Sequence, residues 1–371
     1  MPVGLVPSPS DEQAMLLDAS ARFMDAECPL ATVRARADGG GYDDRAYRKV
    51  AADFGWFGLL ADEEAGGGSV SGNGLVDAAL IAAERGARVQ PGPFTGHSVV
   101  VHTLAKARSH GDLLAELVRG AAWATWAFGP EVSCALRDVG DDLRLDGTIA
   151  VVADAGDCEH LLVSARGPAG LTQVLVPVGA PGVTVRPIEG LDVTRKWFAI
   201  ELAEVTVAPD DVVGAPGAAT EELVAHQGQV AAVLAAAESV GAMRAHFELA
   251  LQYAKDRIAF GRPIGSFQAI KHLLADTSLW LEMATGMVAA AATALGDDRP
   301  EGPELAHATK AFVAEQGVEL AHNCFQVFGG IGYTWEHDQH LFFRRLAADA
   351  ATFGTAAWHR SQLLDVVGVG R

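Results

Sequence analysis

One segment in the second half of the chain limits the possible folds more than any other. Residues 221–255 are rich in Ala and nearly free of Gly, so they predict a single helix of 35 residues, about 50 Å long. Its buried stripe would contain Val230, Val233, Leu234, Ala237 and Gly241. Further helices are predicted at about 266–295, 302–328 and 336–365. The C-terminal part of the chain therefore predicts a bundle of four long helices.

The spacing of the apolar residues changes twice along the chain. From about 10 to 120 the spacing is helical, and Ser8 or Ser10 would be the N-cap of the first helix. From about 121 to 215, short runs rich in Val, Ile, Leu and Thr alternate with Gly, Pro and Asp, which predicts antiparallel strands of sandwich or barrel type. The expected fold class is α+β, mostly α. We expect three domains: an N-terminal helical domain (1–120), a middle antiparallel β domain (121–215) and a C-terminal four-helix bundle (216–371).

The charge of the chain excludes one large class of function. There are 47 acidic and 28 basic residues, which gives a net charge of −19 at pH 7. A nucleic-acid-binding protein needs a basic face that releases the counterions of the phosphates. We therefore expect no nucleic acid as a partner. A few local Arg or Lys side chains can still bind an anionic ligand in an acidic protein.

The cysteine and apolar patterns are typical of a cytoplasmic protein. The four Cys lie far apart and form no Cys-x-x-Cys pair, so they predict neither a zinc site nor a disulfide framework. The first 30 residues contain no basic segment before an apolar run, which argues against a signal peptide. No stretch approaches the ~18–20 uninterrupted apolar residues of a membrane span. We expect a cytoplasmic protein without such a span.

Two segments of the C-terminal part are the strongest functional signal. They read RIAFGRPIGSFQ at 257–268 and QVFGGIGYTWEHD at 326–338. Alone, an Arg before Phe-Gly is usually a helix end with a Gly cap, and a Gly-Gly pair is usually a turn. Together, at this separation and inside helical sequence, the two segments resemble the flavin-binding segments of the acyl-CoA dehydrogenase family. The resemblance covers nearly the whole chain, including GWFGLLADEEAGGG at 55–68 and PGPF at 91–94.

This resemblance implies a flavoenzyme with FAD as its cofactor. Such enzymes remove an α-proton and a β-hydride from an acyl-CoA and leave the trans-2-enoyl thioester. The FAD lies between the β domain and the bundle of one subunit, and the bundle of a neighbouring subunit binds its ADP half. The electron acceptor of the family is usually an electron-transferring flavoprotein.

The resemblance also assigns cofactor-binding residues. Arg257 would meet the pyrophosphate, because a planar guanidinium suits a bidentate phosphate contact. Phe260 would pack on the cofactor and Gln268 would form a hydrogen bond with it. In the second segment, glycine lets backbone N–H groups approach the ADP portion closely. The remaining residues implied to bind the cofactor are Gln326, Gly329, Gly330 and Thr355.

The β region departs from the family pattern. Most members of the family stack the flavin on the Trp of a Trp-x-Thr element that follows a Gly-Thr pair. Here Gly147-Thr148 is followed by Val151 at the Trp position and by Ala153 at the Thr position. The upstream strand reads WAFGPEVSCA (126–135), without the Thr-Glu-Pro and Gly-Ser-Asp of the family. Loss of the stacking ring and of several hydrogen-bond donors predicts that the chain's own flavin pocket is inactive.

The catalytic base is the second departure. The family commonly has a Glu directly before Gly-Thr near the C-terminus, and Phe353 occupies that position here. The alternative Glu position of a minority of members corresponds to Ala231. Glu238 lies seven residues further on, about 20° round the same helix. It is either the base, since desolvation beside an acyl chain raises a carboxyl pKa, or a hydrogen-bonded structural acid at a helix contact.

A retained cofactor-binding segment beside a lost pocket resembles one subunit of the α2β2 acyl-CoA dehydrogenases of bacterial steroid side-chain degradation. Our leading hypothesis is that a homologous subunit supplies the base and the isoalloxazine pocket for a bulky, steroid-type acyl-CoA. The alternatives are a self-sufficient homo-oligomeric dehydrogenase that uses Glu238, and a flavin-free scaffold subunit. We predict no metal at His337, Asp338 and His340, which belong to the family segment. Arg344 and Arg345 are predicted to pair with acids between helices.

Overall fold

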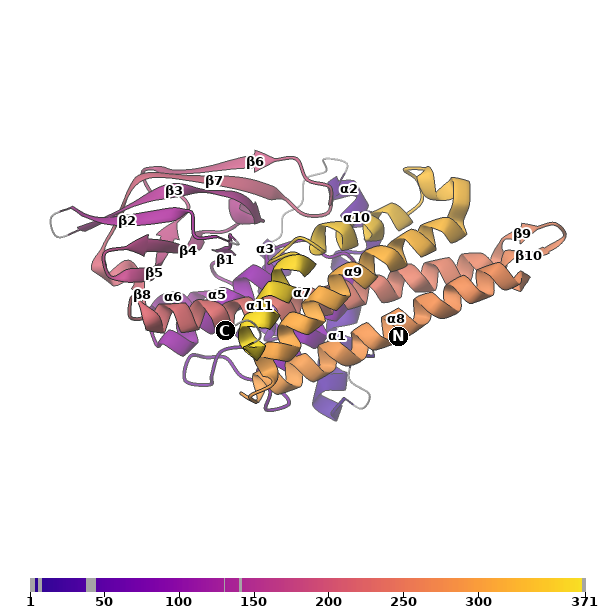
Figure 1. Ribbon diagram of the computed structural model, residues 1–371, viewed down its shortest axis with the longest axis horizontal. Coiled ribbons are helices and arrows are strands. Elements are labelled where there is room, and N and C mark those ends of the chain that lie inside the picture. Colours follow the sequence, from indigo (N-terminus) through magenta and orange to yellow (C-terminus); the bar gives the residue numbers. More distant parts are fainter. Residues whose placement is uncertain (1–3, 6–8, 38–44, 130, 140–141, 369–371) are drawn as a thin grey trace.

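The computed structural model describes residues 4–5, 9–37, 45–129, 131–139 and 142–368. In these residues helices come first, then strands, then helices again (Figure 1). The N-terminal helices are α1 (Asp11–Glu27), α2 (Leu30–Ala37), α3 (Arg45–Asp53), α4 (Gly74–Gly86), α5 (Phe94–Ala107) and α6 (Gly111–Val118). Ser10 is the N-cap of α1 and forms a capping box with Gln13, as the sequence predicts. Ser8 lies outside the described residues.

The central strands form one mixed sheet. They are β1 (Ala124–Ala127), β2 (Cys134–Val139), β3 (Asp142–Ala153), β4 (His160–Gly167), β5 (Gly170–Pro177), β6 (Val183–Ile188), β7 (Trp197–Val207) and β8 (Val212–Val213). Their order is β6-β7-β3-β2-β4-β5-β8, and β1 lies beside β4. Most pairs are antiparallel, as predicted, but β4 is parallel to both β1 and β2. The reason is that β1 and β2 are successive stretches along β4, and the chain keeps its direction from one to the next.

The C-terminal helices are α7 (Ala218–Asp256), α8 (Gln268–Gly296), α9 (Gly302–Phe328), α10 (Gln339–Asp349) and α11 (Ala356–Val367). The 39 residues of α7 confirm the long helix, and α7 packs against α8, α9 and α10. The prediction of a single helix over 336–365 is wrong, because the helix is interrupted between α10 and α11. Phe353 and Gly354 have φ angles of +56° and +107° there, which an α-helix does not allow.

One end of the bundle projects away from the sheet. A hairpin of β9 (Ile258–Ala259) and β10 (Arg262–Pro263) joins α7 to α8, and the short helix η5 (Gly329–Tyr333) follows α9. Figure 1 shows both turns at the end of the molecule opposite the sheet. We call residues 257–268 and 326–335 the bundle tip. This end presents the two sequence segments that carry the flavin signal.

One helix of the described residues, α8, is long and apolar enough by composition to cross a membrane. Its sequence includes Asp276 and Glu282, and it packs along α7 and α9 within the bundle. A core helix passes the same compositional test, so we describe α8 as part of the bundle core. The four cysteines are buried and free.

Candidate functional site

The structure divides the sequence-predicted site residues between two places. Those at the bundle tip are Arg257, Phe260, Gln268, Gln326, Gly329 and Gly330. Glu238 and Thr355 instead line a cavity between the sheet and the bundle. Glu238 and Arg257 are 19 residues apart along α7 and its end, which corresponds to about 28 Å. The two groups therefore cannot meet one ligand within a single copy of this chain unless that ligand spans this distance.

The predicted cofactor-binding side chains of the bundle tip face solvent. Phe260 is 95% exposed, and its φ of +50° is unfavourable for a bulky residue. Arg257 and Gln268 are exposed as well. A Cβ built on Gly329 or Gly330 would meet no atom within 4 Å, so both glycines border open space. An exposed ring on strained backbone contributes little to the core of this chain, and it indicates contact with a ligand or partner.

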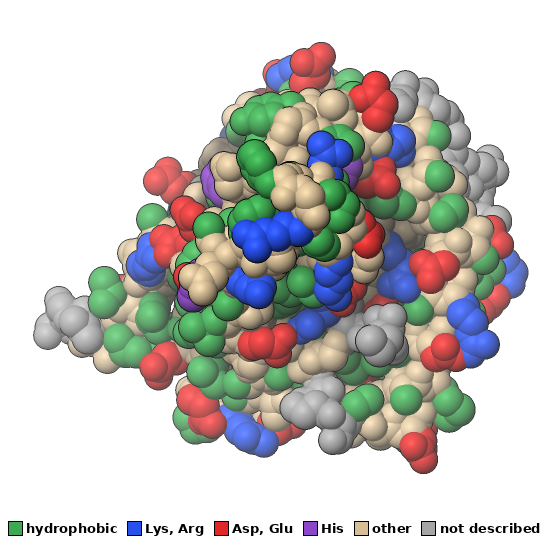
Figure 2. Space-filling view, turned by 90° about the vertical axis from the view of Figure 1, so that its right-hand side faces the viewer, with side chains coloured by type: hydrophobic (Ala, Val, Ile, Leu, Met, Phe, Trp, Pro, Cys, Tyr) green, Lys and Arg blue, Asp and Glu red, His purple; other side chains and the backbone are tan. Residues whose placement is uncertain are grey.

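The bundle tip combines positive charge with apolar rings. Figure 2 looks onto this end of the molecule and shows Lys and Arg side chains gathered among hydrophobic ones. The exposed basic residues in and beside the tip are Lys255, Arg257, Arg262 and Lys271. Tyr333 adds a second ring, which is 80% exposed. In a chain of net charge −19, this surface suits a ligand that carries both phosphates and a flat ring.

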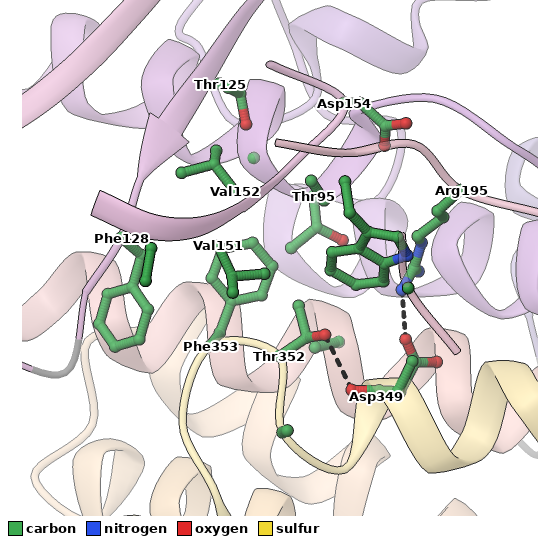
Figure 3. A pocket seen from close by; sticks show the side chains of 18 of the residues that line it. Thr95, Thr125, Phe128, Val151, Val152, Asp154, Arg195, Asp349, Thr352 and Phe353 are labelled. Atoms are coloured by element: carbon green, nitrogen blue, oxygen red, sulfur yellow. Dashed lines mark hydrogen bonds and ion pairs between the residues drawn. The ribbon is translucent and has the colours of Figure 1, made fainter. Parts of the chain in front are cut away.

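The cavity has a volume of about 930 Å³ (Figure 3). Strands β1 and β3 supply one wall, and α7 with residues 347–358 supplies the other. Val151, the residue at the family's Trp position, lies on this wall and is 52% exposed. The register of β3 shifts between Ile149 and Val152, so Val151 lies in an irregular stretch of the strand. At the position predicted for the stacking ring, the cavity therefore presents a small aliphatic side chain.

Aromatic rings surround Phe353, which occupies the position predicted for the family's catalytic carboxylate. Phe353 stacks on Trp126 with ring centroids 6.2 Å apart and planes at 13°. Phe128 lies 6.1 Å from Phe353 and meets Trp358 edge-on at 5.9 Å. Thr355 is exposed, and its hydroxyl accepts a hydrogen bond from the backbone N–H of Trp358, which caps α11. A cofactor contact at Thr355 stays a prediction.

Glu238 lies in a network of buried charges. Its Oε1 accepts from Nη2 of Arg195 and from Nη1 of Arg345, each at 2.7 Å. Arg345 also pairs with Asp192 at 2.6 Å, and Arg195 pairs with Asp349. Burial by itself would raise the pKa of Glu238, but the two guanidinium groups outweigh burial and hold that pKa below its usual value. Because a carboxylate stabilised in this way is a weak base, the contacts favour the structural role of Glu238.

Close helix packing fixes the position of Glu238. At the crossing of α4 and α7, a Cβ added to Gly86 would overlap the carbonyl oxygen of Glu238. A Cβ added to Gly241 would likewise overlap the carbonyl oxygen of Ala83. Both positions therefore need Gly, and the two helix backbones touch there. Glu238 points from this crossing toward the two arginines.

The cavity offers no free cation to a phosphate group. All the residues that line it are described, and the acids among them are Glu131, Asp154, Glu189, Glu238 and Asp349. Arg195 is the basic residue of that set, and it is already paired with Glu238 and Asp349. The cavity therefore offers an anionic group no unpaired cation, whereas the bundle tip has exposed cations and open glycines.

Several contacts around the site differ from the sequence expectations or were missed. Arg345 pairs with acids, as predicted, but Arg344 donates to the carbonyl of Leu191 instead. Arg195 was missed, because nothing in the local sequence marks a loop Arg as the partner of a helix Glu. Asp338 pairs with Arg34 of α2, which connects the segment after the bundle tip to the N-terminal helices.

Comparison with known proteins gives consistent matches over most of the chain. The family model "Acyl-CoA dehydrogenase, N-terminal domain" matches residues 10–111, and "Acyl-CoA dehydrogenase, C-terminal domain" matches residues 211–368. The chain is 31% identical to acyl-CoA dehydrogenase IpdE2 of Mycobacterium tuberculosis, over 92% of this chain and 93% of that protein. It is 33% identical to acyl-CoA dehydrogenase FadE34 of the same organism, over 79% of this chain but 38% of that longer protein.

Two solved structures share the fold. The Tcur3481–Tcur3483 steroid ACAD superposes with a TM-score of 0.86 and 27% identity, over 97% of this chain and 98% of that chain. The ChsE4–ChsE5 complex from Mycobacterium tuberculosis superposes with a TM-score of 0.88 and 22% identity, over 98% and 99%. The likeness to the second structure shows the fold alone.

Proposed function

This chain belongs to the acyl-CoA dehydrogenase family, and on that premise we propose that it is one subunit of a heteromeric, α2β2 enzyme. Enzymes of this family are oxidoreductases that act on a CH–CH group and use FAD. In this proposal a homologous subunit supplies the isoalloxazine pocket and the catalytic base. This chain supplies the binding site for the ADP half of the same FAD. The observation that carries the proposal is the contrast between an open, basic, aromatic bundle tip and a cavity lined by Val151 and Phe353, at the positions predicted for the stacking Trp and the catalytic Glu.

Each residue of the bundle tip has a defined role in this proposal. Arg257 binds the pyrophosphate through two parallel N–H donors, and Phe260 packs on the cofactor. Gln268 and Gln326, both exposed, orient it by hydrogen bonds, and the open backbone at 329–330 lets it approach closely. When bound, FAD accepts the hydride that leaves the β-carbon of the substrate. The part of this chain is to bind the cofactor and hold it in place.

We propose a bulky, steroid-type acyl-CoA thioester as the substrate. The support is the Tcur3481–Tcur3483 protein, which is named a steroid ACAD and matches nearly the whole chain at 27% identity. The arrangement of two different subunits is supported by that protein and by the ChsE4–ChsE5 complex, because each structure is named after two different proteins. We propose an electron-transferring flavoprotein as the acceptor and the cytoplasm as the compartment.

The test is Arg257→Ala in the complex with a homologous subunit that retains the Trp-x-Thr element and the catalytic Glu. Each lost charge-assisted hydrogen bond costs about 1.5–3 kcal/mol, so we expect FAD affinity to fall by at least roughly tenfold and activity to follow flavin content. Arg244→Ala is the matched control, since Arg244 lies on α7 and pairs with Glu282 on the bundle surface. Full flavin retention and activity in Arg257→Ala would overturn the proposal.

A further inference from the structure

We propose that Gln339 is a positioning residue, which holds the Gly-rich turn of the bundle tip in the conformation that receives the cofactor. This inference rests on the proposed function and deepens it, because Gln339 lies outside both segments of the bundle tip. Gln339 is the first residue of α10 and is 1% exposed. A ligand at the surface does not reach this side chain, so it acts through the turn that it contacts.

The turn η5 has an open end and a buried end. At the open end, a Cβ added to Gly329 or Gly330 would meet no atom within 4 Å. At the buried end, a Cβ added to Gly332 would lie 3.2 Å from the Cβ of Phe328 and 3.5 Å from the ring of Phe325. Because the two ends are two residues apart, the conformation of the buried end limits how the open backbone can turn.

Gln339 forms a hydrogen bond with the buried end. Its Nε2 donates to the carbonyl oxygen of Gly332 at 2.6 Å. This bond connects the start of α10 to η5 and spans seven residues of sequence. A buried carbonyl needs a partner, since leaving it unpaired is unfavourable. The amide of Gln339 therefore fixes the side of the turn on which the Gly332 carbonyl lies.

The position of Gln339 is itself well supported. Its backbone N–H donates to Nδ1 of His337 at 3.2 Å, and α10 packs against α7 and α9. Below the turn, the ring of His246 stacks with Phe328 of α9 and with Phe342 of α10, at interplanar angles of 11° and 21°. Burial lowers the pKa of His246 to about 3, so this stack is uncharged at neutral pH. The amide thus projects from a packed support.

A fixed turn favours binding, because η5 would otherwise be flexible. Three of its five residues are glycine, namely Gly329, Gly330 and Gly332. Glycine has the greatest backbone freedom of all residues, and a ligand that orders a free backbone loses affinity. A hydrogen bond that orders the turn beforehand reduces this loss. Gln339 would therefore raise FAD affinity without contacting FAD.

The test removes the N–H donor and keeps the shape of the side chain. Gln339→Met is unbranched, similar in length and without a donor. In the isolated chain, native-state hydrogen exchange of the amides at 330–334 should become roughly three- to tenfold faster, including that of Thr334, which donates to the carbonyl of Ile331. In the complex with a homologous subunit, FAD affinity should fall by a similar factor, as for one lost hydrogen bond.

Gln227→Met is the matched control at a second buried amide. The side chain of Gln227 exchanges two hydrogen bonds with that of Gln173, at 2.8 and 2.7 Å. It lies 30 residues before Arg257, which corresponds to about 45 Å along α7. This variant should lower the urea midpoint of unfolding, but leave FAD affinity and the exchange at 330–334 unchanged.

Gln339→Leu, which also lacks a donor, should reproduce the result of Gln339→Met. Wild-type FAD affinity or unchanged exchange at 330–334 in both variants would overturn the inference. An equal loss of FAD affinity in Gln227→Met would overturn it as well, since the effect would then follow general stability. These outcomes leave the proposed function in place as long as Arg257→Ala loses flavin. Full flavin retention in Arg257→Ala would instead overturn the proposed function.

Discussion

The cavity lies beside the middle of α7 and the bundle tip at its C-terminal end, and the two regions use charge in opposite ways. Near the cavity, α7 places Glu238 between two buried arginines, so the charges there stabilise the fold. At its C-terminal end, α7 leads into Arg257 and Phe260, whose side chains face solvent. Charges buried in pairs are poor ligand partners, because they are already satisfied. The comparison shows exposed cations at the bundle tip and buried, paired charges beside the cavity, which is the contrast that the proposed function rests on.

The largest expected effect tests the claim that the charges near the cavity are structural. Arg345→Met removes a partner from both Asp192 and Glu238, so we expect the free energy of unfolding to fall by about 3–5 kcal/mol. Flavin per folded complex should not change. Arg344→Met, at the neighbouring position, should cost less than about 1 kcal/mol in the same urea titration. Equal losses for the two variants would contradict the distinction.

The pH dependence of stability gives a second test of the buried charges near the cavity. Burial raises the pKa of Asp154 to about 6, so the folded state holds its proton more tightly than the unfolded chain does. Wild type therefore loses stability as the pH rises from about 4 through 6. Asp154→Asn cannot ionise and should be more stable than wild type by up to about 3 kcal/mol at pH 8, with no gain below about pH 4.

The matched control for that titration is Asp138→Asn, on the exposed face of β2. It should change the free energy of unfolding by less than about 0.5 kcal/mol at pH 8. A constant difference between Asp154→Asn and wild type from pH 4 to pH 8 would show that Asp154 is not desolvated in the folded protein.

A smaller effect is expected at the bundle tip, where a substitution should change flavin affinity but not the stability of the chain. Phe260→Ala removes a ring that is 95% exposed, so the stability of the isolated chain should change by less than about 0.5 kcal/mol. Flavin affinity of the complex should fall about tenfold, as for the loss of an aromatic anchor. Val139→Ala, another exposed apolar residue, should change neither quantity. A destabilised Phe260→Ala chain with normal flavin affinity would reverse the roles of the two regions.

The smallest expected effect concerns turnover. Glu238→Gln should leave the turnover of the folded complex within about threefold of wild type, because Glu238 is held ionised by Arg195 and Arg345. Single-turnover flavin reduction measures this directly. A general base contributes about 10²–10⁴-fold, so a loss of that size with flavin retained would restore Glu238 as the catalytic base.

The structural features that follow from local sequence pattern were predicted correctly. The uninterrupted apolar spacing of α7 and the Gly-rich turns of the bundle tip are readable over a few residues, and the structure places both as expected in the fold. The break at Phe353 was missed, because the Ala-rich stretch before it favours helix and the stacking on Trp126 is a tertiary contact. The parallel pairs of β4 were missed for the same reason, since strand direction depends on long-range pairing.

The charge network shows the same limit. Arg345 is 107 residues from Glu238 in sequence, and local spacing does not bring the two together. The sequence therefore left two roles open for Glu238, and the distances to the two guanidinium groups favour the structural role.

The central claim is tested most directly by the flavin content and native mass of this chain, purified alone and co-expressed with a homologous subunit that retains the catalytic Glu. The account predicts a colourless chain alone, and a yellow heteromer with one FAD for every two chains. A yellow homo-oligomer with one FAD per chain would contradict it, because the cavity described here would then have to hold the flavin.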